Sequence, residues 1–548
     1  MNDNPRFAIL AILDGWGLAP AGPGNAITQA NIPNMRGYWV SFPHTQLGAS
    51  GQSVGLPRGE VGNTETGHLN IGAGRIVYQD LARINMAIAD GSFFENPELL
   101  GAIDHARRNN SSIHLMGLLG AGGVHSNAEH LYALLSLMHK HNIQNVFIHV
   151  FTDGRDSPPN AAKTYITELE KVCTREGVGK IASVMGRYWA MDRDHRWERT
   201  LSAYNALVGA EAKTAQTPIQ AIDTSYAQGK TDEFVEPTLI VGEGEKPHLI
   251  SDNDAVIFFN FRIDRPRQLS REFLMQDGNA LALNWGFDPF TVKYGGKHTE
   301  EVTPVVLPEK RKKILKNLYF ATMTEYEKPL VDAGAHVCFP PEKIAMPLGR
   351  VISSHGYRQL RAAESEKERF VTFYMNGQEE GAFAGEERLI VPSPKVATYD
   401  LAPQMSAIEL TEAVINKISP GGYSLVIMNF ANADMVGHTG NLASCIKAVE
   451  TIDSCIGKLG NFVLSRGGAL FITADHGNVE EKIDSHTGQI STEHTGNPVP
   501  FIVVSQPYIG KGTMLPSGIL ADIAPTILQY LSIEAPSSMM GKNLLSSL

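Results

Sequence analysis

The sequence predicts an α/β protein built from two domains. Short apolar runs bounded by Gly, Asp or Pro alternate with longer helical patterns, as buried parallel strands and their covering helices do. Residues of metal-ligand type follow strands near the start and the end of the chain, whereas cationic residues follow the strands in the middle. We therefore expect a metal-binding sheet with helices on both faces, interrupted by an inserted α/β domain that binds anions.

The predicted strands are short apolar runs, each too short for a buried helix. They lie at Phe7–Leu13, Ile113–Leu118, Val146–Phe151, Ile181–Met185, Ala255–Phe261, Leu318–Thr322, Phe370–Tyr374, Ser424–Phe430, Ala469–Thr473 and Phe501–Val504. One helix is also well marked, because Ser406 and Glu409 have capping-box spacing. They precede four apolar positions that share one helical face, namely Leu410, Val414, Ile415 and Ile418.

Domain boundaries are expected near residues 80 and 315. Residues 1–80 and 316–548 would form the discontinuous metal-binding domain, and residues 81–315 the inserted substrate-binding domain. The segment 277–316 is rich in Lys, Gly and Pro and weakly periodic, which indicates a linker and a surface insertion.

The composition is that of an ordinary globular protein, with 548 residues of which 43% are hydrophobic. A formal net charge of −11 disfavours nucleic-acid and membrane partners, so any phosphate site must be a local cluster of positive charge. No apolar run could span a bilayer and no signal-peptide pattern is present, so we expect a cytoplasmic protein. We also expect a monomer. The four cysteines show no CxxC spacing and fit a reducing compartment.

Candidate metal ligands follow three predicted strands and precede a fourth. They are Asp14, Asp434, His438, Asp475, His476 and His494. On a helix, the four-residue spacing of Asp434 and His438 would place both on one face, although such a spacing also arises by chance. The pair Asp475-His476 is a stronger signal because it directly follows a strand. Three carboxylates and three imidazoles suffice for two mixed N/O sites, suited to Mn²⁺ or Zn²⁺ rather than Ca²⁺.

Thr64 lies in a glycine-rich stretch, Gly59 to Arg75, that precedes a helix-compatible run. As a helix N-cap it would only stabilise the helix, which is the commoner role of such a threonine. As a nucleophile near a helix N-terminus, it would be activated by metal coordination for attack on phosphorus. The stretch matches neither common nucleotide-binding pattern.

A second, mostly cationic set follows the middle strands. Its members are His125, Arg155, Asp156, Arg187, Arg193, Arg262 and Arg265. Most arginines are solvated surface charges, but five placed just after strands favour a site for carboxylate and phosphate groups. His125 could carry a proton or bind phosphate, and a structurally satisfied histidine is the alternative.

Ten motifs, in order through nearly the whole chain, resemble the cofactor-independent phosphoglycerate mutase family. They are DGWG (14–17), GNTETGHLNIGAGR (62–75), GGVHS (122–126), DGRDSPP (153–159), GRYWAMDRDHRW (186–197), FNFRIDRPRQ (259–268), VPSPKVATYD (391–400), NFANADMVGHTG (429–440), TADHGN (473–478) and HTGNPVP (494–500). The metal-binding half also resembles the alkaline phosphatase superfamily, which implies an alkaline-phosphatase-like sheet for that domain.

The resemblance implies interconversion of 3-phosphoglycerate and 2-phosphoglycerate in glycolysis and gluconeogenesis, without 2,3-bisphosphoglycerate. It implies two Mn²⁺ ions, with Co²⁺, Zn²⁺ or Mg²⁺ as alternatives. One ion would be held by Asp434, His438 and His494, the other by Asp14, Asp475, His476 and the hydroxyl of Thr64. It also implies that Lys367, together with the cationic set, holds the substrate.

Two departures from the family pattern stand out. The nucleophile is normally Ser in GNSE, and this chain has Thr64 there, which keeps the hydroxyl and adds a methyl group. Lys367 falls in ESEKERF, where the family usually reads ETEK. We expect Thr64 to form a phosphothreonine, glycerate to reorient with Asp156 as the base, and the domains to exclude water. The alternatives are a phosphatase or sulfatase of the same superfamily, and a binding protein that has lost catalysis.

Overall fold

The computed structural model describes residues 7–209, 211–275, 313–484 and 487–548. These ranges form two compact units, residues 1–79 with 342–548 and residues 80–341. Most of the segment 277–316, predicted to be a linker and insertion, lies outside the described residues. Within the described ranges, no helix combines the length and apolar character needed to cross a membrane.

The second boundary between the units lies near residue 341 instead of near residue 315. The reason is strand pairing, since β9 (Tyr319–Thr324) pairs with β8 (Ala255–Phe258) and β10 (Ala335–Phe339) pairs with β9. Both strands therefore extend the sheet of the inserted unit.

The first unit contains an eight-stranded sheet in the order β12-β11-β13-β1-β14-β15-β2-β16. Strands β12, β11, β13, β1 and β14 run parallel, whereas β15 is antiparallel to both β14 and β2. The strands are β1 (Ala8–Leu13), β2 (His44–Gly48), β11 (Arg358–Glu364), β12 (Glu386–Val391), β13 (Tyr423–Phe430), β14 (Ala469–Thr473), β15 (Val499–Ser505) and β16 (Gly518–Ile519).

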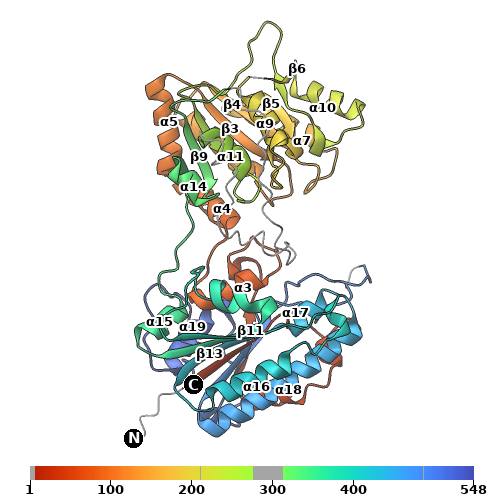
Figure 1. Cartoon of the computed structure of the whole chain (residues 1–548), viewed down its shortest axis with the longest axis vertical. Helices are drawn as coiled ribbons and strands as arrows, with labels where there is room; N and C mark the ends of the chain where they lie inside the picture. The colour runs from red at the N-terminus through yellow and green to blue at the C-terminus, as the bar shows by residue number, and fades with distance from the viewer. Residues whose placement is uncertain (1–6, 210, 276–312, 485–486) are drawn as a thin grey trace. The chain divides into compact units, whose positions relative to one another are not determined.

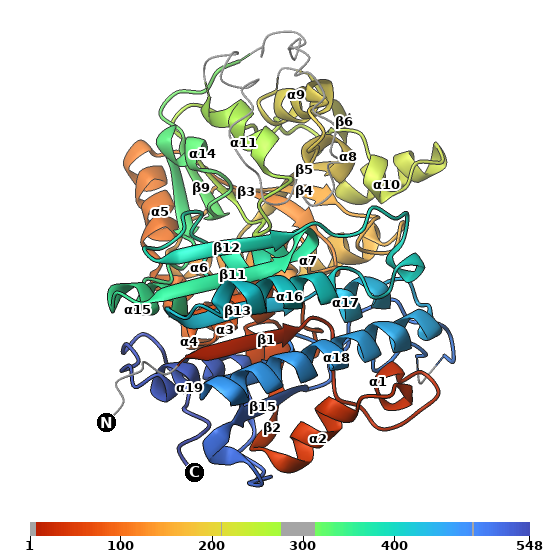
Figure 2. The same ribbon diagram turned by 60° about the horizontal axis from the view of Figure 1, so that its bottom comes forward.

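Helices cover both faces of this sheet. The long helix α18 and helix α16 lie side by side on one face, and α3, α15 and α19 lie on the other (Figures 1 and 2). Their apolar sides and the fully buried β1 and β13 share one core. The helices are α1 (Ala26–Gln29), α2 (Pro33–Ser41), α3 (Thr64–Ala73), α15 (Leu348–Ser354), α16 (Ala407–Ile418), α17 (Asn432–Gly437), α18 (Leu442–Arg466) and α19 (Ile523–Tyr530).

The second unit has its own eight-stranded sheet, in the order β10-β9-β8-β3-β4-β5-β7-β6. Strands β10 to β5 in that order are parallel, and β7 is antiparallel to β5. The remaining strands are β3 (Ile113–Leu119), β4 (Val146–Thr152), β5 (Lys180–Gly186), β6 (Lys213–Ala215) and β7 (Thr238–Ile240).

Two separate apolar clusters cover the two faces of the second sheet. Neighbours along β3 show the alternation, since Leu115 packs in one cluster and Met116 in the other. The helices are α4 (Asp80–Asp90), α5 (Pro97–Asn109), α6 (Ala128–Lys140), α7 (Ala162–Glu176), α8 (Arg187–Ala190), α9 (Trp197–Leu207), α10 (Pro218–Ala227), α11 (Arg267–Leu274) and α14 (Lys328–Asp332).

The predicted α/β class, with two domains, is confirmed. Each sheet is mixed, because an antiparallel strand joins its parallel strands. The strand predicted at Phe370–Tyr374 is wrong, because those residues form a helical turn that follows β11. The helix predicted after Ser406 is present as α16, but the capping box is not formed. The hydroxyl of Ser406 donates to the carbonyl of Pro392 instead.

Candidate metal centre and anion-binding cluster

The carboxyl ends of three neighbouring parallel strands meet at one edge of the first unit's sheet. Strand β1 pairs with β13 on one side and with β14 on the other. Asp14 follows β1, Asp434 lies in α17 directly after β13, and Asp475 with His476 follow β14. Asp14, Asp434 and Asp475, which lie far apart in the sequence, are therefore close together at this edge.

The imidazoles of His438 and His494 direct their Nε2 atoms at one carboxylate oxygen. Nδ1 of His438 lies 2.8 Å from the carbonyl of Thr492, and Nδ1 of His494 lies 2.9 Å from the carbonyl of Gly62. Because a carbonyl only accepts, each Nδ1 donates a hydrogen bond there and leaves Nε2 to face Asp434. The hydrogen bond to the Asp434 carboxylate raises the pKa of His438. Those Nε2 atoms lie 3.2 and 3.1 Å from Oδ1 of Asp434 and 3.1 Å from each other. These three atoms are potential ligands, close enough together to share one cation.

His476 lies in a neighbouring cluster, beside the carboxylates of Asp14 and Asp475. Its Nε2 lies 3.3 Å from Oδ1 of Asp14, 3.6 Å from Oδ2 of Asp475 and 3.0 Å from Oγ1 of Thr64. Burial alone would lower the pKa of His476, but the carboxylates of Asp475, Asp434 and Asp14 outweigh it and raise the pKa to about 10. Without a metal ion, this imidazole therefore holds a proton in the place of a cation.

The donor atoms fit divalent metal ions. Two groups of three residues each bring their ligand atoms within 4.8 Å of one another. One group is Asp434, His476 and His494, and the other is Asp14, Asp475 and His476. Mixed nitrogen and oxygen donors suit Mn²⁺, Zn²⁺ or Co²⁺ better than Ca²⁺. All six residues predicted as ligands thus lie in one cluster, with His476 between the two groups.

Thr64 is the first residue of helix α3 and points into this cluster. The N-cap is the preceding residue, Asn63, whose side chain accepts from the backbone N–H of Thr66. The hydroxyl of Thr64 is therefore not used as a cap, and it lies 3.3 Å from Oδ1 of Asp14. The alternative in which Thr64 only caps the helix does not hold.

Lys367 also lies in the metal cluster, in the first unit, while the cationic set lies in the second. Its ammonium is 2.9 Å from Oδ1 of Asp14, 2.7 Å from Oδ2 of Asp434 and 3.2 Å from Oγ1 of Thr64. The side chain is 3% exposed, which by itself would lower the pKa of Lys367, but the surrounding carboxylates raise it. The lysine is thus a permanent cation beside the Thr64 hydroxyl.

Two residues that the sequence did not single out support the carboxylate ligands. Asn429, the next-to-last residue of β13, donates to Oδ2 of Asp14 at 2.8 Å. His68, one turn after Thr64, has Nδ1 3.3 Å from Oδ2 of Asp475 and 2.9 Å from the carbonyl of Thr64. The spacing of Thr64 and His68 on one helical face was the available signal for His68.

In the second unit, the cationic set gathers at the carboxyl ends of β3, β4, β5 and β8. Arg187 is buried at the end of β5, and its Nη1 donates to Asp153 at 2.6 Å and to Asp156 at 2.5 Å. Burial raises the pKa of Asp156, but the Arg187 guanidinium outweighs it and the pKa is lowered. Asp156 is therefore ionised at neutral pH.

His125 is a neutral imidazole between two carboxylates. Its Nε2 lies 3.6 Å from Asp156 and its Nδ1 3.7 Å from Asp264. Burial and the nearby guanidinium of Arg187 lower the pKa of His125 to about 3. The carbonyl of His125 accepts the backbone N–H of Phe261 at 2.9 Å, which fixes the loop after β8.

The other arginines surround His125 and its two neighbouring carboxylates with an excess of positive charge. Asp264 accepts from Arg193 at 2.8 Å and from Arg262 at 3.2 Å. Arg265 donates to the carbonyl of Met191 at 3.1 Å, and its buried Nε has no hydrogen-bond partner among the described residues. Burial and the neighbouring arginines lower the pKa of Arg265 to about 10, and Arg155 is one of those neighbours. Such crowding of guanidinium groups is relieved by a bound anion.

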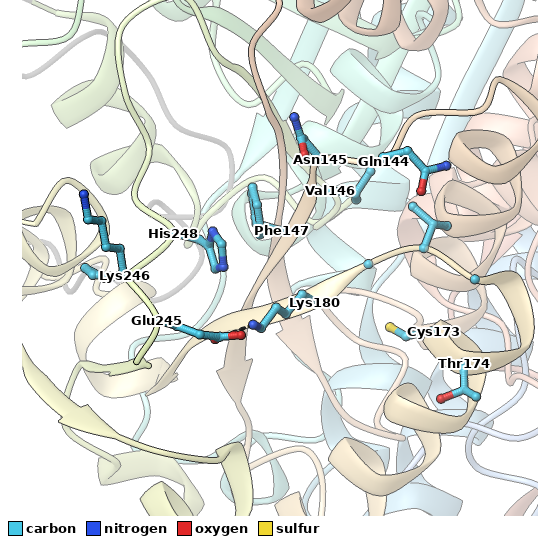
Figure 3. Close-up of a pocket in the computed structure, with 14 residues that line it drawn as sticks. Gln144, Asn145, Val146, Phe147, Cys173, Thr174, Lys180, Glu245, Lys246 and His248 are labelled. Atoms are coloured by element: carbon cyan, nitrogen blue, oxygen red, sulfur yellow. Dashed lines mark hydrogen bonds and ion pairs between the residues drawn. The ribbon is translucent and has the colours of Figure 1, made fainter. Parts of the chain in front are cut away.

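A cavity of about 730 Å³ opens at the opposite end of β4 and β5 (Figure 3). Residues that line it include Asn145, Phe147, Lys180 and His248, and none of the predicted site residues does so among those described. Lys180 and Glu245, which both line this cavity, form an ion pair (Figure 3). The predicted site residues of this unit instead lie at the carboxyl ends of the strands.

The chain is similar to several proteins of one family. A family model described as the BPG-independent PGAM N-terminus matches residues 84–328. The 2,3-bisphosphoglycerate-independent phosphoglycerate mutase of Moorella thermoacetica is 48% identical over 540 residues, with 98% of each chain covered. The protein of that name from Clostridium acetobutylicum is 49% identical over 536 residues, again with 98% of each covered. A crystal structure of Leishmania mexicana phosphoglycerate mutase at low cobalt concentration matches with a TM-score of 0.59 and 29% identity, over 99% of this chain and 98% of that chain.

Proposed function

The chain belongs to the family of 2,3-bisphosphoglycerate-independent phosphoglycerate mutases, and from this premise we propose that it interconverts 3-phosphoglycerate and 2-phosphoglycerate through a phosphothreonine on Thr64. The observation that supports the phosphothreonine most directly is the position of the Thr64 hydroxyl. It lies within 3.3 Å of Asp14, His476 and Lys367, in a cluster of cation-binding groups and free of any capping role.

Two divalent ions, Mn²⁺ in the first place, would be held by the ligands that the structure brings together. Asp434, His438 and His494 would hold one, and Asp14, Asp475, His476 and Thr64 the other. Such ions, when bound, neutralise charge on phosphoryl oxygens and make a hydroxyl easier to deprotonate. The first unit would thus be the metal-binding domain and the second unit the substrate-binding domain.

In the first half-reaction, Oγ1 of Thr64 loses its proton and attacks the phosphorus of 3-phosphoglycerate. The bond between phosphorus and the C3 oxygen breaks, and that oxygen takes up one proton, which balances the proton that Thr64 loses, so that glycerate separates from the phosphoryl group. Lys367, 3.2 Å from Oγ1, places a fixed positive charge beside the transferring group.

In the second half-reaction, the 2-hydroxyl oxygen of glycerate attacks the phosphorus of the phosphothreonine. The bond between phosphorus and Oγ1 breaks, and Oγ1 takes up one proton, which balances the proton that the 2-hydroxyl loses. The arginines of the second unit would bind the carboxylate of glycerate throughout, so that glycerate reorients without leaving. Asp156 would take the proton of the 2-hydroxyl, since it is ionised and part-exposed. His125, being neutral, would serve as a hydrogen-bonding group to the substrate.

The phosphothreonine is tested by a rapid-quench experiment with 3-phosphoglycerate that carries a radiolabelled phosphate. We expect label on the peptide that contains Thr64, none in Thr64→Val, which keeps the shape without the hydroxyl, and label again in Thr64→Ser. Label on another residue, or isomerisation by Thr64→Val, would refute the proposed nucleophile.

A further inference from the structure

Resting on the proposed metal centre, we propose that Glu480 is a positioning residue that sets the affinity of this centre for divalent ions. Glu480 is 2% exposed and lies in the loop after Asp475 and His476. It touches none of the predicted ligands, and its polar sequence context, VEEK, is typical of a surface loop. Its contacts give it a different role.

The carboxylate of Glu480 joins three segments that each carry ligands. Oε2 accepts the backbone N–H of Gly17, three residues after Asp14, at 3.1 Å. The same oxygen accepts the backbone N–H of Asn478, two residues after His476, at 2.8 Å. Both segments are thereby fixed to one buried atom.

The other oxygen, Oε1, fixes the segment that carries His494. It accepts the hydroxyl of Thr495 and, at 3.1 Å, the side-chain amide of Asn497. A backbone bridge between Gly477 and Thr495 holds the same two segments together. One carboxylate with four donors thus sets the spacing of the loops after β1, after β14 and before β15.

The close approach of these loops requires glycine. A Cβ at Gly17 would lie 2.3 Å from the carboxyl carbon of Glu480, and one at Gly477 would lie 2.2 Å from its Oε1. Because both positions exclude any side chain, the carboxylate has little room to move. Its geometry is built into the sequence of the two turns.

Two residues on the same loop extend this support to the remaining ligand segment. The amide of Asn478 donates to Oδ1 of Asp434 at 3.0 Å. Lys482, 1% exposed, donates in turn to Oδ1 of Asn478 and, at 3.1 Å, to the carbonyl of Gly437, next to His438. Residues 478–482 therefore connect every segment that carries a predicted carboxylate or imidazole ligand, with Glu480 making the larger share of the links.

The test compares Glu480→Gln with Glu481→Gln, which removes the same charge from the neighbouring, partly exposed residue. Each protein is stripped with EDTA and titrated with Mn²⁺, with free Mn²⁺ followed by electron paramagnetic resonance. Losing such a supporting contact costs about 10- to 100-fold in metal affinity. We expect that weakening for Glu480→Gln, a Kd within about threefold of wild type for Glu481→Gln, and the wild-type number of ions at saturation.

Kinetics separate positioning of the metal from a direct effect on substrate. At saturating Mn²⁺, the kcat of Glu480→Gln should return towards wild type and KM for phosphoglycerate should be unchanged. Equal Mn²⁺ affinity in the two variants would overturn the inference, and so would a raised KM with unchanged metal binding. Should Glu480→Gln not fold, Thr495→Val removes one of the four donors and should weaken Mn²⁺ binding by a smaller factor; unchanged binding there also overturns it. The titration contains no phosphoglycerate, so a wild type that binds Mn²⁺ without isomerising its substrate would refute the proposed function and leave this inference standing.

Discussion

Glu364 should make the stability of the protein depend on pH in a way that one substitution removes. This residue ends strand β11, three residues before Lys367, and is fully buried. Oε1 accepts the backbone N–H of Ser406 at 3.0 Å, whereas the buried Oε2 has no hydrogen-bond partner among the described residues. Burial raises the pKa of Glu364 from 4.5 to about 7. The fold therefore favours the protonated carboxyl group.

The size and sign of the effect follow from that pKa. Each pKa unit between the folded and unfolded chain is worth about 1.4 kcal/mol, so a rise from 4.5 to about 7 corresponds to about 3 kcal/mol. Because the folded pKa is the higher one, the penalty is absent below about pH 4.5 and complete above about pH 7. Glu364→Gln keeps the acceptor for Ser406 and removes the ionisable group. It should be more stable than wild type by up to about 3 kcal/mol at pH 8, and by less than about 1 kcal/mol at pH 5.

Urea unfolding at pH 5 and pH 8, in EDTA, measures this difference directly. Glu368→Gln, on an exposed neighbour, is the matched control and should show no such gain. A difference between Glu364→Gln and wild type that is the same at both pH values would refute the reasoning, and so would a variant less stable than wild type at pH 8.

Three further predictions concern the two clusters. Lys367→Met removes the buried ammonium beside the carboxylates of Asp14 and Asp434, so in EDTA the free energy of unfolding should fall by about 3 kcal/mol. Bound Mn²⁺ should recover part of that loss. Urea unfolding with and without Mn²⁺ checks this, and an unchanged midpoint in EDTA contradicts it. Arg265→Met should raise KM for phosphoglycerate about 10- to 100-fold, the value of a charged hydrogen bond. Thermal unfolding should stay close to wild type, because the fold loses one hydrogen bond, to Met191, and Asp264 keeps its bonds to Arg193 and Arg262. A large fall in Tm with unchanged KM would assign Arg265 a structural role. Without a metal ion, His476 holds a proton with a pKa of about 10, and that proton must leave when the ion binds. The affinity for Mn²⁺ should therefore rise up to about tenfold per pH unit from pH 6 to pH 9. A Mn²⁺ affinity that does not change over this pH range contradicts the ligand set.

The sequence revealed those parts of the site that depend on local patterns. Short apolar strands with polar residues at their carboxyl ends predicted the α/β class, and parallel pairing brings Asp14, Asp434 and Asp475 together as expected. The placement of Thr64 at the start of a helix was also predictable from its glycine-rich surroundings. In each case the signal lies within a few residues of the chain.

What the sequence did not reveal depends on long-range pairing. Strand β11 contains Gln359, Arg361 and Glu364, all fully buried, so its sequence does not read as a buried strand. The separation of Lys367 from the arginines follows from the same strand, because β11 pairs with β13 in the first unit. Glu480 escaped notice because three of its four donors come from two other segments, at Gly17 and at Thr495 and Asn497, and no spacing in the sequence indicates them.

The most direct test of the proposed function is conversion of 3-phosphoglycerate to 2-phosphoglycerate with added Mn²⁺ and without 2,3-bisphosphoglycerate, with free phosphate measured in the same tube. We predict isomerisation with little release of phosphate, and loss of isomerisation after treatment with EDTA. Release of phosphate without isomerisation would identify a hydrolase. The absence of both 2-phosphoglycerate and free phosphate would identify a protein that binds without catalysing. Either result would contradict the proposed function.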